Sequence, residues 1–324
     1  MKYVEAIRQA IHDSMEENSE MVILGQGVWS PFYVGSSMDG IEAKFGRERV
    51  IDTPVSENAV TGMGFGLATK GTPSLIIHPR MDFMILAMDP IVNAAAKWRY
   101  SLSFKGELPM TVRAIINRGG EQGAQHSQAL HSWFAHIPGL RVVMPSSPKD
   151  AYFLLRQCIQ SPDPAIYIED RWSYEIEEDF NTKESFGRLD NEGPKIIQEG
   201  EKLTLVGIGH SVNICKEALK TFPLGEIELI DLRIVNPLRT EIISESVDKT
   251  GKLVVVDGGW KASGLASEVV ACVSESVKNK MKSNPIRCTL PFAPAPTSAR
   301  LEKNYYLSAE HLRNQLSKVL GADF

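Results

Sequence analysis

The sequence predicts a two-domain α/β protein in which parallel sheets are covered by helices on both faces. Short runs rich in β-branched residues alternate along the chain with amphipathic stretches of helical length. These runs are continuously apolar, which is typical of parallel strands buried on both faces. The length of 324 residues corresponds to two domains at roughly 100–200 residues each.

In the first half of the chain, strands and helices are expected to alternate. An amphipathic helix comes first, with Val4, Ile7 and Ile11 on its apolar face. Strands are expected at Val22–Leu24, Ser74–Ile77, Met110–Ile116, Arg141–Met144 and Ala165–Ile168. Helices are expected between them at Ala59–Thr69, Asp82–Tyr100, Gln128–His136 and Lys149–Gln160.

A change of composition marks the expected domain boundary. Residues 173–200 are polar and acidic, with glycine and proline at intervals, which is typical of a linker. We therefore expect a first domain over 1–178, a linker over 179–195 and a second domain over 196–324. In the second domain, strands are expected at 203–206, 228–232, 253–256 and 286–290, and helices at 212–222, 241–249, 266–277 and 308–320. The proline-rich stretch 291–300 is expected to be extended.

Composition excludes several classes of protein. The net charge is −5, and no basic block resembles a nucleic-acid footprint. The longest apolar runs are far too short to span a bilayer. Four scattered cysteines include no CxxC pair, so neither a disulfide framework nor a zinc site is expected. We therefore expect a cytoplasmic protein that binds neither nucleic acid nor membrane.

One glycine motif and one histidine cluster suggest chemistry but have simpler explanations. Gly207-Ile-Gly209 follows an expected strand, and Asp231 ends the next one, as in a dinucleotide fingerprint. The third glycine position is Val212, so we favour a structural role and keep a nicotinamide enzyme as a remote alternative. His126, His131 and His136 are spaced by five, which prevents them from sharing one helix face as metal ligands.

Two further features stay open on the residues alone. Glu57 precedes a helix with few polar residues, where an acid either stabilises the helix dipole or serves a site. The polar segment Gly123–Gln128 lies between a strand and a helix, where α/β folds place active-site loops. It is equally compatible with an ordinary capped helix start.

Taken together, these segments resemble a known family, the beta subunits of thiamine-diphosphate-dependent 2-oxo acid dehydrogenases of the pyruvate and branched-chain type. The resemblance covers nearly the whole chain, and its motifs occur in the family's order. They are Asp52–Glu57, Met81–Asn93, Gly123–Gln128, Trp133–Pro145, Ile230–Arg233, Pro237-Leu238 and Thr250–Val256. The resemblance implies a transketolase-like pyrimidine-binding domain followed by a transketolase C-terminal-like domain.

The resemblance also implies roles for three residues. Glu57 matches the carboxyl that exchanges a proton with the cofactor's pyrimidine ring, and burial beside an apolar ring favours the protonated acid. Phe83 matches the aromatic residue that packs on that ring. His126 matches the active-site histidine that handles protons or the acyl acceptor, which suits an imidazole.

Such subunits are half of an enzyme. In the family, an alpha subunit holds the cofactor's diphosphate and Mg²⁺ through a Gly-Asp-Gly motif, which this sequence lacks; its nearest triplets are Met38-Asp-Gly40 and Val256-Asp-Gly258. An alpha partner in a two-alpha, two-beta assembly is therefore implied, with a lipoyl acyltransferase core as a further partner. The family also places a monovalent cation such as K⁺ in a loop that matches Cys158, Ile159, Ser161 and Asp163, with Ser161 where an acid is usual.

The leading hypothesis is a subunit that decarboxylates a pyruvate-like 2-oxo acid and passes the acyl group to a lipoyl carrier. The alternative is a two-subunit acyloin or ketol transferase that adds the two-carbon unit to an aldehyde or ketosugar. Arg80, Arg118 and Glu121 motivate it, because a polar acceptor needs polar partners. A non-catalytic scaffolding protein is the third hypothesis, and the presence of Glu57 and His126 argues against it.

Overall fold

The computed structural model describes residues 1–103 and 105–321, which form two compact units. The first unit comprises Met1–Arg118 and Trp133–Glu192. The second comprises Gly193–Phe324 together with an earlier segment, Gly119–Ser132. The second unit therefore contains a piece of chain that the sequence places between two strands of the first.

The first unit contains parallel strands in the order β5-β6-β4-β3-β1-β2. Their bounds are β1 Val22–Gly25, β2 Val50–Asp52, β3 Ser74–His78, β4 Met110–Ile116, β5 Arg141–Val143 and β6 Ala165–Asp170. Strands β3, β4 and β6 are buried along their whole length, as their continuous apolar runs predict. The buried Arg113 of β4 forms an ion pair with Glu169 of β6, with 2.6 Å between Nη2 and Oε1.

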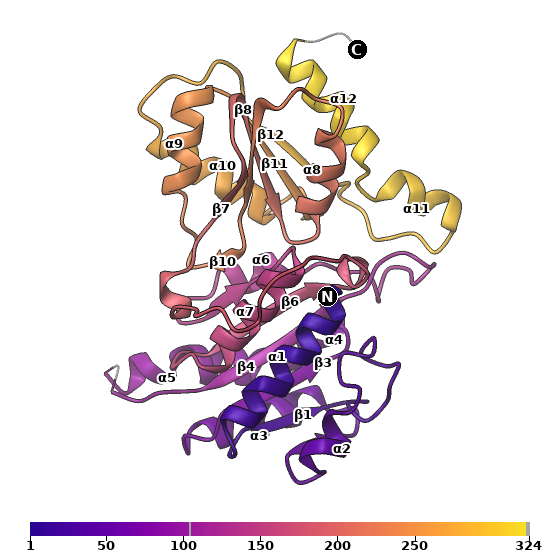
Figure 1. Ribbon diagram of the computed structural model, residues 1–324, viewed down its shortest axis with the longest axis vertical. Helices are drawn as coiled ribbons and strands as arrows, with labels where there is room; N and C mark the ends of the chain where they lie inside the picture. The colour runs from indigo at the N-terminus through magenta and orange to yellow at the C-terminus, as the bar shows by residue number, and fades with distance from the viewer. Residues whose placement is uncertain (104, 322–324) are drawn as a thin grey trace. The chain divides into compact units, whose positions relative to one another are not determined.

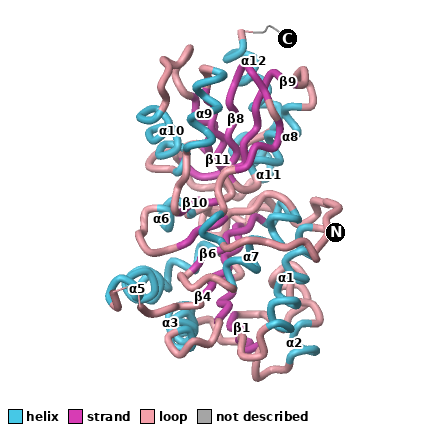
Figure 2. Tube along the Cα trace, turned by 60° about the vertical axis from the view of Figure 1, so that its left-hand side comes forward, coloured by secondary structure: helices cyan, strands magenta, loops and turns pink. Residues whose placement is uncertain are grey.

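Helices cover both faces of this sheet (Figure 2). Helices α1 (Tyr3–Glu17) and α7 (Pro148–Ile159) lie together on one side, and α3 (Glu57–Ala68) and α5 (Ala96–Ser101) lie on the other. The shorter helical segments are α2 Ile41–Phe45, α4 Met81–Met84, η1 Ile85–Ala87, η2 Asp89–Ala95, η3 Arg171–Ser173 and η4 Leu189–Asn191. Helix α6, His131–Ala135, spans the division between the units.

The second unit contains a sheet with the order β12-β11-β8-β9-β7, in which only β7 is antiparallel to its neighbour. Its strands are β7 Lys195–Gln198, β8 Gly200–Ile208, β9 Gly225–Asp231, β11 Leu253–Trp260 and β12 Ile286–Leu290; β10 is Ile234–Asn236. Its helices are α8 Ser211–Leu219, α9 Glu241–Thr250, α10 Leu265–Ser276, α11 Ala299–Tyr305 and α12 Ala309–Leu320. Figure 1 shows α9 and α10 on one side of the sheet and α8 and α12 on the other.

The fold class expected from the sequence is confirmed, and the differences lie in single elements. The expected helix over 82–100 is a series of short α, 3₁₀ and π segments, since Pro90 lacks the N–H that a continuous helix needs. The expected helix over 128–136 shortens to α6. Helix α11 begins at Ala299, inside a stretch expected to be extended.

Two observations bear on alternatives raised by the sequence. A Cβ on Gly207 would lie 2.8 Å from Cγ2 of Val212, so this glycine allows the close packing of α8 on β8. That contact supports a structural role for Gly207-Ile-Gly209. Within the described ranges, no helix has both the length and the apolar character needed to cross a bilayer.

Candidate active site

Glu57 lies at the first position of α3, after a short loop that leaves β2. Its half-buried side chain lines a shallow recess at the carboxyl ends of β1, β2 and β3. The other lining residues are Gln26, Thr53, Pro54, Ser56, Val60, Ile77, His78 and Pro79. Ligands of open parallel α/β sheets bind at this edge, outside the carboxyl ends of the strands.

His78 is a member of this recess that sequence reasoning missed as a site residue. It ends β3, is buried, and its Nε2 lies 3.0 Å from Oγ1 of Thr61, one turn beyond Glu57 on α3. Burial lowers the pKa of His78 to about 4, so the ring is neutral at physiological pH. The sequence could have indicated His78 as a site residue, because a polar residue at the end of an apolar strand is unusual.

Phe83 lies on the short helix α4, with 37% of its surface exposed. Its neighbours Met81, Asp82 and Met84 are buried and fix the helix against the first unit. Part of the aromatic ring therefore remains accessible for stacking. Glu57 and Phe83 both belong to the first unit.

His126 belongs to the segment Gly119–Ser132 and therefore to the second unit. Its side chain is half-buried, and its backbone N–H donates to the carbonyl of Gly123 at 3.4 Å. The same segment contains His131, which is fully buried beside Asp257 of β11. The spacing of the histidines did not predict that contact.

The expected cation loop follows α7 in the first unit. Cys158 and Ile159 are buried in the last turn of the helix, and the hydroxyl of Ser161 accepts the Asp163 N–H at 3.1 Å. The Asp163 carboxylate contacts both Arg99 and Arg141. Burial opposes ionisation, but the hydrogen bonds and charges of these two arginines lower the pKa of Asp163. Its side chain thus already has cationic partners.

Two residues that motivate the ketol transferase also have internal partners. Nε of Arg118 lies 2.8 Å from the Asp170 carboxylate in the first unit. Oε1 of Glu121 accepts the backbone N–H of Ala299 at 3.0 Å in the second. Both side chains therefore have a partner within their own unit.

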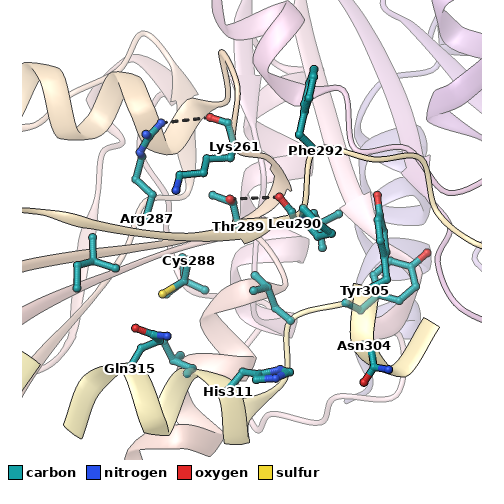
Figure 3. Close-up of a pocket in the computed structure, with 16 residues that line it drawn as sticks. Lys261, Arg287, Cys288, Thr289, Leu290, Phe292, Asn304, Tyr305, His311 and Gln315 are labelled. Carbon is teal, nitrogen blue, oxygen red and sulfur yellow. Dashed lines mark hydrogen bonds between the residues drawn. The ribbon is translucent and has the colours of Figure 1, made fainter. Parts of the chain in front are cut away.

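A larger pocket of about 560 Å³ lies in the second unit, between the edge strand β12 and helices α11 and α12 (Figure 3). None of the residues predicted from the sequence lines it. Arg287 donates to the backbone carbonyl of Lys261 at 3.2 Å, as Figure 3 shows. Burial raises the pKa of the Cys288 thiol to about 11, against the opposing charge of Lys261, so that thiol stays protonated.

Comparison with known proteins identifies the two units. Residues 1–176 match the transketolase pyrimidine binding domain, and residues 194–312 match the transketolase C-terminal domain. The chain is 33% identical to the beta subunit of acetoin:2,6-dichlorophenolindophenol oxidoreductase of Cupriavidus necator, covering 97% of this chain and 96% of the relative. It is 32% identical to the beta subunit of 2-oxoisovalerate dehydrogenase of Bacillus subtilis, covering 98% of both.

The chain belongs to the family of thiamine-diphosphate-dependent 2-oxo acid dehydrogenase beta subunits. The resemblance stated from its sequence motifs is thereby confirmed. The family also includes the mitochondrial pyruvate dehydrogenase E1 component subunit beta of Dictyostelium discoideum, which is 30% identical over 97% of this chain and 90% of the relative. A solved structure described as "Split gene transketolase, inactive beta4 tetramer" has a TM-score of 0.76 at 20% identity, over 100% of this chain and 99% of that one, and supports the fold.

The groups that line the recess suit one half of thiamine diphosphate, although its enclosed volume of about 10 Å³ is smaller than a pyrimidine ring. A carboxyl at Glu57 and a neutral imidazole at His78 suit an uncharged heteroaromatic ring, whereas Phe83 is not among the lining residues. Within the described part of the chain, no lysine or arginine lines the recess. Cationic side chains are the groups that hold a diphosphate most strongly, so a recess without them suits the pyrimidine better than the phosphates.

Proposed function

We propose that this chain is the beta half of a thiamine-diphosphate-dependent enzyme that decarboxylates a 2-oxo acid and transfers the acyl group to a lipoyl carrier. The observation that carries the proposal is the position of Glu57, at the start of α3 and at the carboxyl ends of three parallel strands. Two of its relatives support it, because they are named as 2-oxoisovalerate dehydrogenase and pyruvate dehydrogenase subunits.

In this proposal the bound cofactor supplies the electron sink for decarboxylation. Glu57 holds and returns a proton at its carboxyl oxygen, facing the pyrimidine ring. Phe83 packs on that ring and excludes water from it. His126 donates or accepts a proton as the acyl group leaves for its acceptor.

An alpha partner is part of the proposal, because none of the described residues that line the recess carries a cationic side chain for the diphosphate. We assign the diphosphate and Mg²⁺ to a partner with a Gly-Asp-Gly motif, in a two-alpha, two-beta assembly. Exposed apolar side chains on the loop before α3, on α3 itself and on η1 support a covered face here: Val55 is 67% exposed, Met63 54% and Leu86 60%. We further propose docking to a lipoyl acyltransferase core, and a cytoplasmic location.

We retain a K⁺ site at the loop formed by Cys158, Ile159, Ser161 and Asp163, with backbone carbonyls as its ligands. The engagement of the Asp163 carboxylate by Arg99 and Arg141 is the reason for assigning carbonyls. Replacing K⁺ by tetramethylammonium should lower the stability of the assembled enzyme. Equal midpoints of thermal unfolding in the two salts would contradict the proposed K⁺ site.

A second candidate function has acetoin in place of a 2-oxo acid as the donor of the acyl group. Relatives from Cupriavidus necator and Bacillus subtilis, 33% and 31% identical, are acetoin:2,6-dichlorophenolindophenol oxidoreductase subunits. Cleavage of acetoin releases an aldehyde and no CO₂, whereas a 2-oxo acid releases CO₂. Measuring both products with each donor separates the two candidates.

Substitution of Glu57 tests the proton transfer that both candidate functions require. In the enzyme assembled with its alpha partner, Glu57→Gln should lower kcat by at least ~100-fold, the usual contribution of a positioned proton-transfer group. Glu48→Gln, an exposed glutamate in the same unit, should leave kcat unchanged. Gel filtration of each variant checks that the assembly persists. Full turnover by an intact Glu57→Gln enzyme would contradict the proposal.

A further inference from the structure

The segment Gly119–Ser132 carries His126 and is tied to the second unit near both of its ends. In the sequence it lies between β4 and the rest of α6, yet its compact packing is with residues after Gly193. The contacts that produce this packing involve Glu121 at one end and His131 and Ser132 at the other. The contacts at both ends involve side chains.

At the first end, Glu121 and helix α11 exchange hydrogen bonds. Oε1 of Glu121 accepts the N–H of Ala299, the first residue of α11, at 3.0 Å. In return, Oε1 of Glu302 accepts the Glu121 N–H at 3.1 Å. Ser298, the N-cap residue, makes no side-chain cap of its own. Glu121 therefore supplies the missing cap of α11, as in a capping box formed by two distant segments.

At the second end, His131 makes a buried polar contact with Asp257. Nε2 of His131 lies 3.0 Å from Oδ1 of Asp257, and neither side chain has exposed surface. The same carboxylate accepts the N–H of Gly259 at 2.8 Å and that of Ala266, in the first turn of α10, at 3.3 Å. A Cβ on Gly259 would lie 3.0 Å from Cε1 of His131, so glycine leaves room for the ring.

Ser132 adds a third contact beside His131 and Asp257. Its hydroxyl oxygen accepts the N–H of Leu265, the first residue of α10, at 3.0 Å. Gly264, at the N-cap, has no side chain to do this. The two open amides at the start of α10 are thus satisfied by Ser132 and Asp257. Together the three contacts leave residues 122–130 as a closed loop held at its base.

We propose that His131, Asp257 and Glu121 are positioning residues that hold His126 in place for acyl transfer. The inference rests on the proposed role of His126 and gives the second unit a part in that step. A displacement of about 1 Å at a reacting group can cost ~100-fold in rate. Fixing both ends of the loop restricts the positions that His126 can take.

The kinetic test compares two reactions of the assembled enzyme. One is oxidation of the 2-oxo acid by dichlorophenolindophenol, and the other is acylation of a free lipoyl domain. We expect His131→Asn and Asp257→Asn to lower kcat for lipoyl acylation by ~100-fold and to leave dye reduction within ~3-fold. His136→Asn, an exposed histidine just past α6, is the matched control and should change neither.

A double variant separates positioning from a general loss of structure. If His131 acts through His126, then His126→Ala with His131→Asn should acylate no more slowly than His126→Ala alone. Additive losses, or equal losses in both reactions, would overturn the proposal. Should His131→Asn fail to assemble, Glu121→Ala at the other end of the loop carries the same expectations.

Hydrogen exchange provides a readout that does not depend on activity. In His131→Asn, amides of residues 122–130 should exchange faster than in the parent enzyme, and β3 and β4 should be unchanged. Unchanged exchange in 122–130 would overturn the proposal, even if activity falls. If the parent enzyme releases no CO₂ from any 2-oxo acid and forms no aldehyde from acetoin, the proposed function fails while the exchange result still tests the anchoring.

Discussion

His78 shows how burial sets the charge of a residue in the recess beside Glu57. Burial lowers the pKa of its imidazole to about 4, whereas an unfolded histidine titrates near 6.5. The oxygen of Thr61 at 3.0 Å is compatible with the neutral ring. An uncharged group at this position suits an uncharged pyrimidine and adds no repulsion toward a protonated cofactor ring.

The lowered pKa of His78 predicts a pH-dependent loss of stability. Because the folded state releases this proton and the unfolded state keeps it, the penalty is absent above pH 6.5 and grows as the pH falls toward 4. The free energy of unfolding should drop by roughly 3 kcal/mol over that window through this group alone. Urea unfolding of the parent chain and of His78→Asn at several pH values measures this loss. The two curves of unfolding free energy against pH should converge or cross as the pH falls. Parallel curves would contradict the assignment.

At the level of single residues, the sequence motifs proposed Glu57, Phe83 and His126 as site residues but did not predict their surroundings. The pair His131–Asp257 joins residues far apart in the chain, and neither residue has a local signature. The same holds for Asp163, whose partners Arg99 and Arg141 come from other elements. Such contacts depend on the tertiary fold, which periodicity and spacing do not encode.

Helix α3 links the site to the surface around it. Its buried side packs on β3 through Gly64, where a Cβ would lie 2.5 Å from Cδ1 of Ile76. Around Gly62 and Gly66 no atom lies within 4 Å of where a Cβ would be. The helix is therefore tightly packed on one side and open on the other, next to the exposed Met63.

This asymmetry predicts opposite effects of the same substitution on one helix. Gly62→Ala should raise the free energy of unfolding of the chain by about 1 kcal/mol, the difference in helix propensity. Gly64→Ala should lower it by roughly 1–3 kcal/mol, because Ile76 must leave its position. Urea unfolding of both variants measures the difference. Equal shifts in one direction would mean that α3 does not pack as described.

At the level of elements, two helices that the sequence did not predict correctly have ends that depend on long-range contacts. Most strands of the two sheets were predictable because continuous apolar runs are a local signal, whereas the short edge strands β2 and β7 were not expected. Helix α11 was not, since its first amide is capped by Glu121 from a distant segment. The short α6 has a similar cause, because His131 and Ser132 bind β11 and α10 instead of extending a helix backwards.

For the whole molecule, the order of motifs was more informative than composition. Length predicted two domains and the net charge gave no indication of nucleic-acid binding, but neither named a reaction. The ordered motifs indicated the family, and matches of residues 1–176 and 194–312 to the two transketolase domains confirm it. Neither the composition nor the motifs predicted that Gly119–Ser132 packs with the second unit. Hydrophobic periodicity does not show to which compact unit a segment belongs.

The central claim is that this chain works as the beta half of a two-chain thiamine enzyme. The most direct measurement is affinity purification of the tagged chain from its own cells, followed by assay of CO₂ release from a panel of 2-oxo acids. We predict an equimolar partner with a Gly-Asp-Gly motif, and CO₂ release that requires thiamine diphosphate and Mg²⁺. Repeated recovery of the chain alone, with no CO₂ release after addition of the cofactor, would contradict the claim.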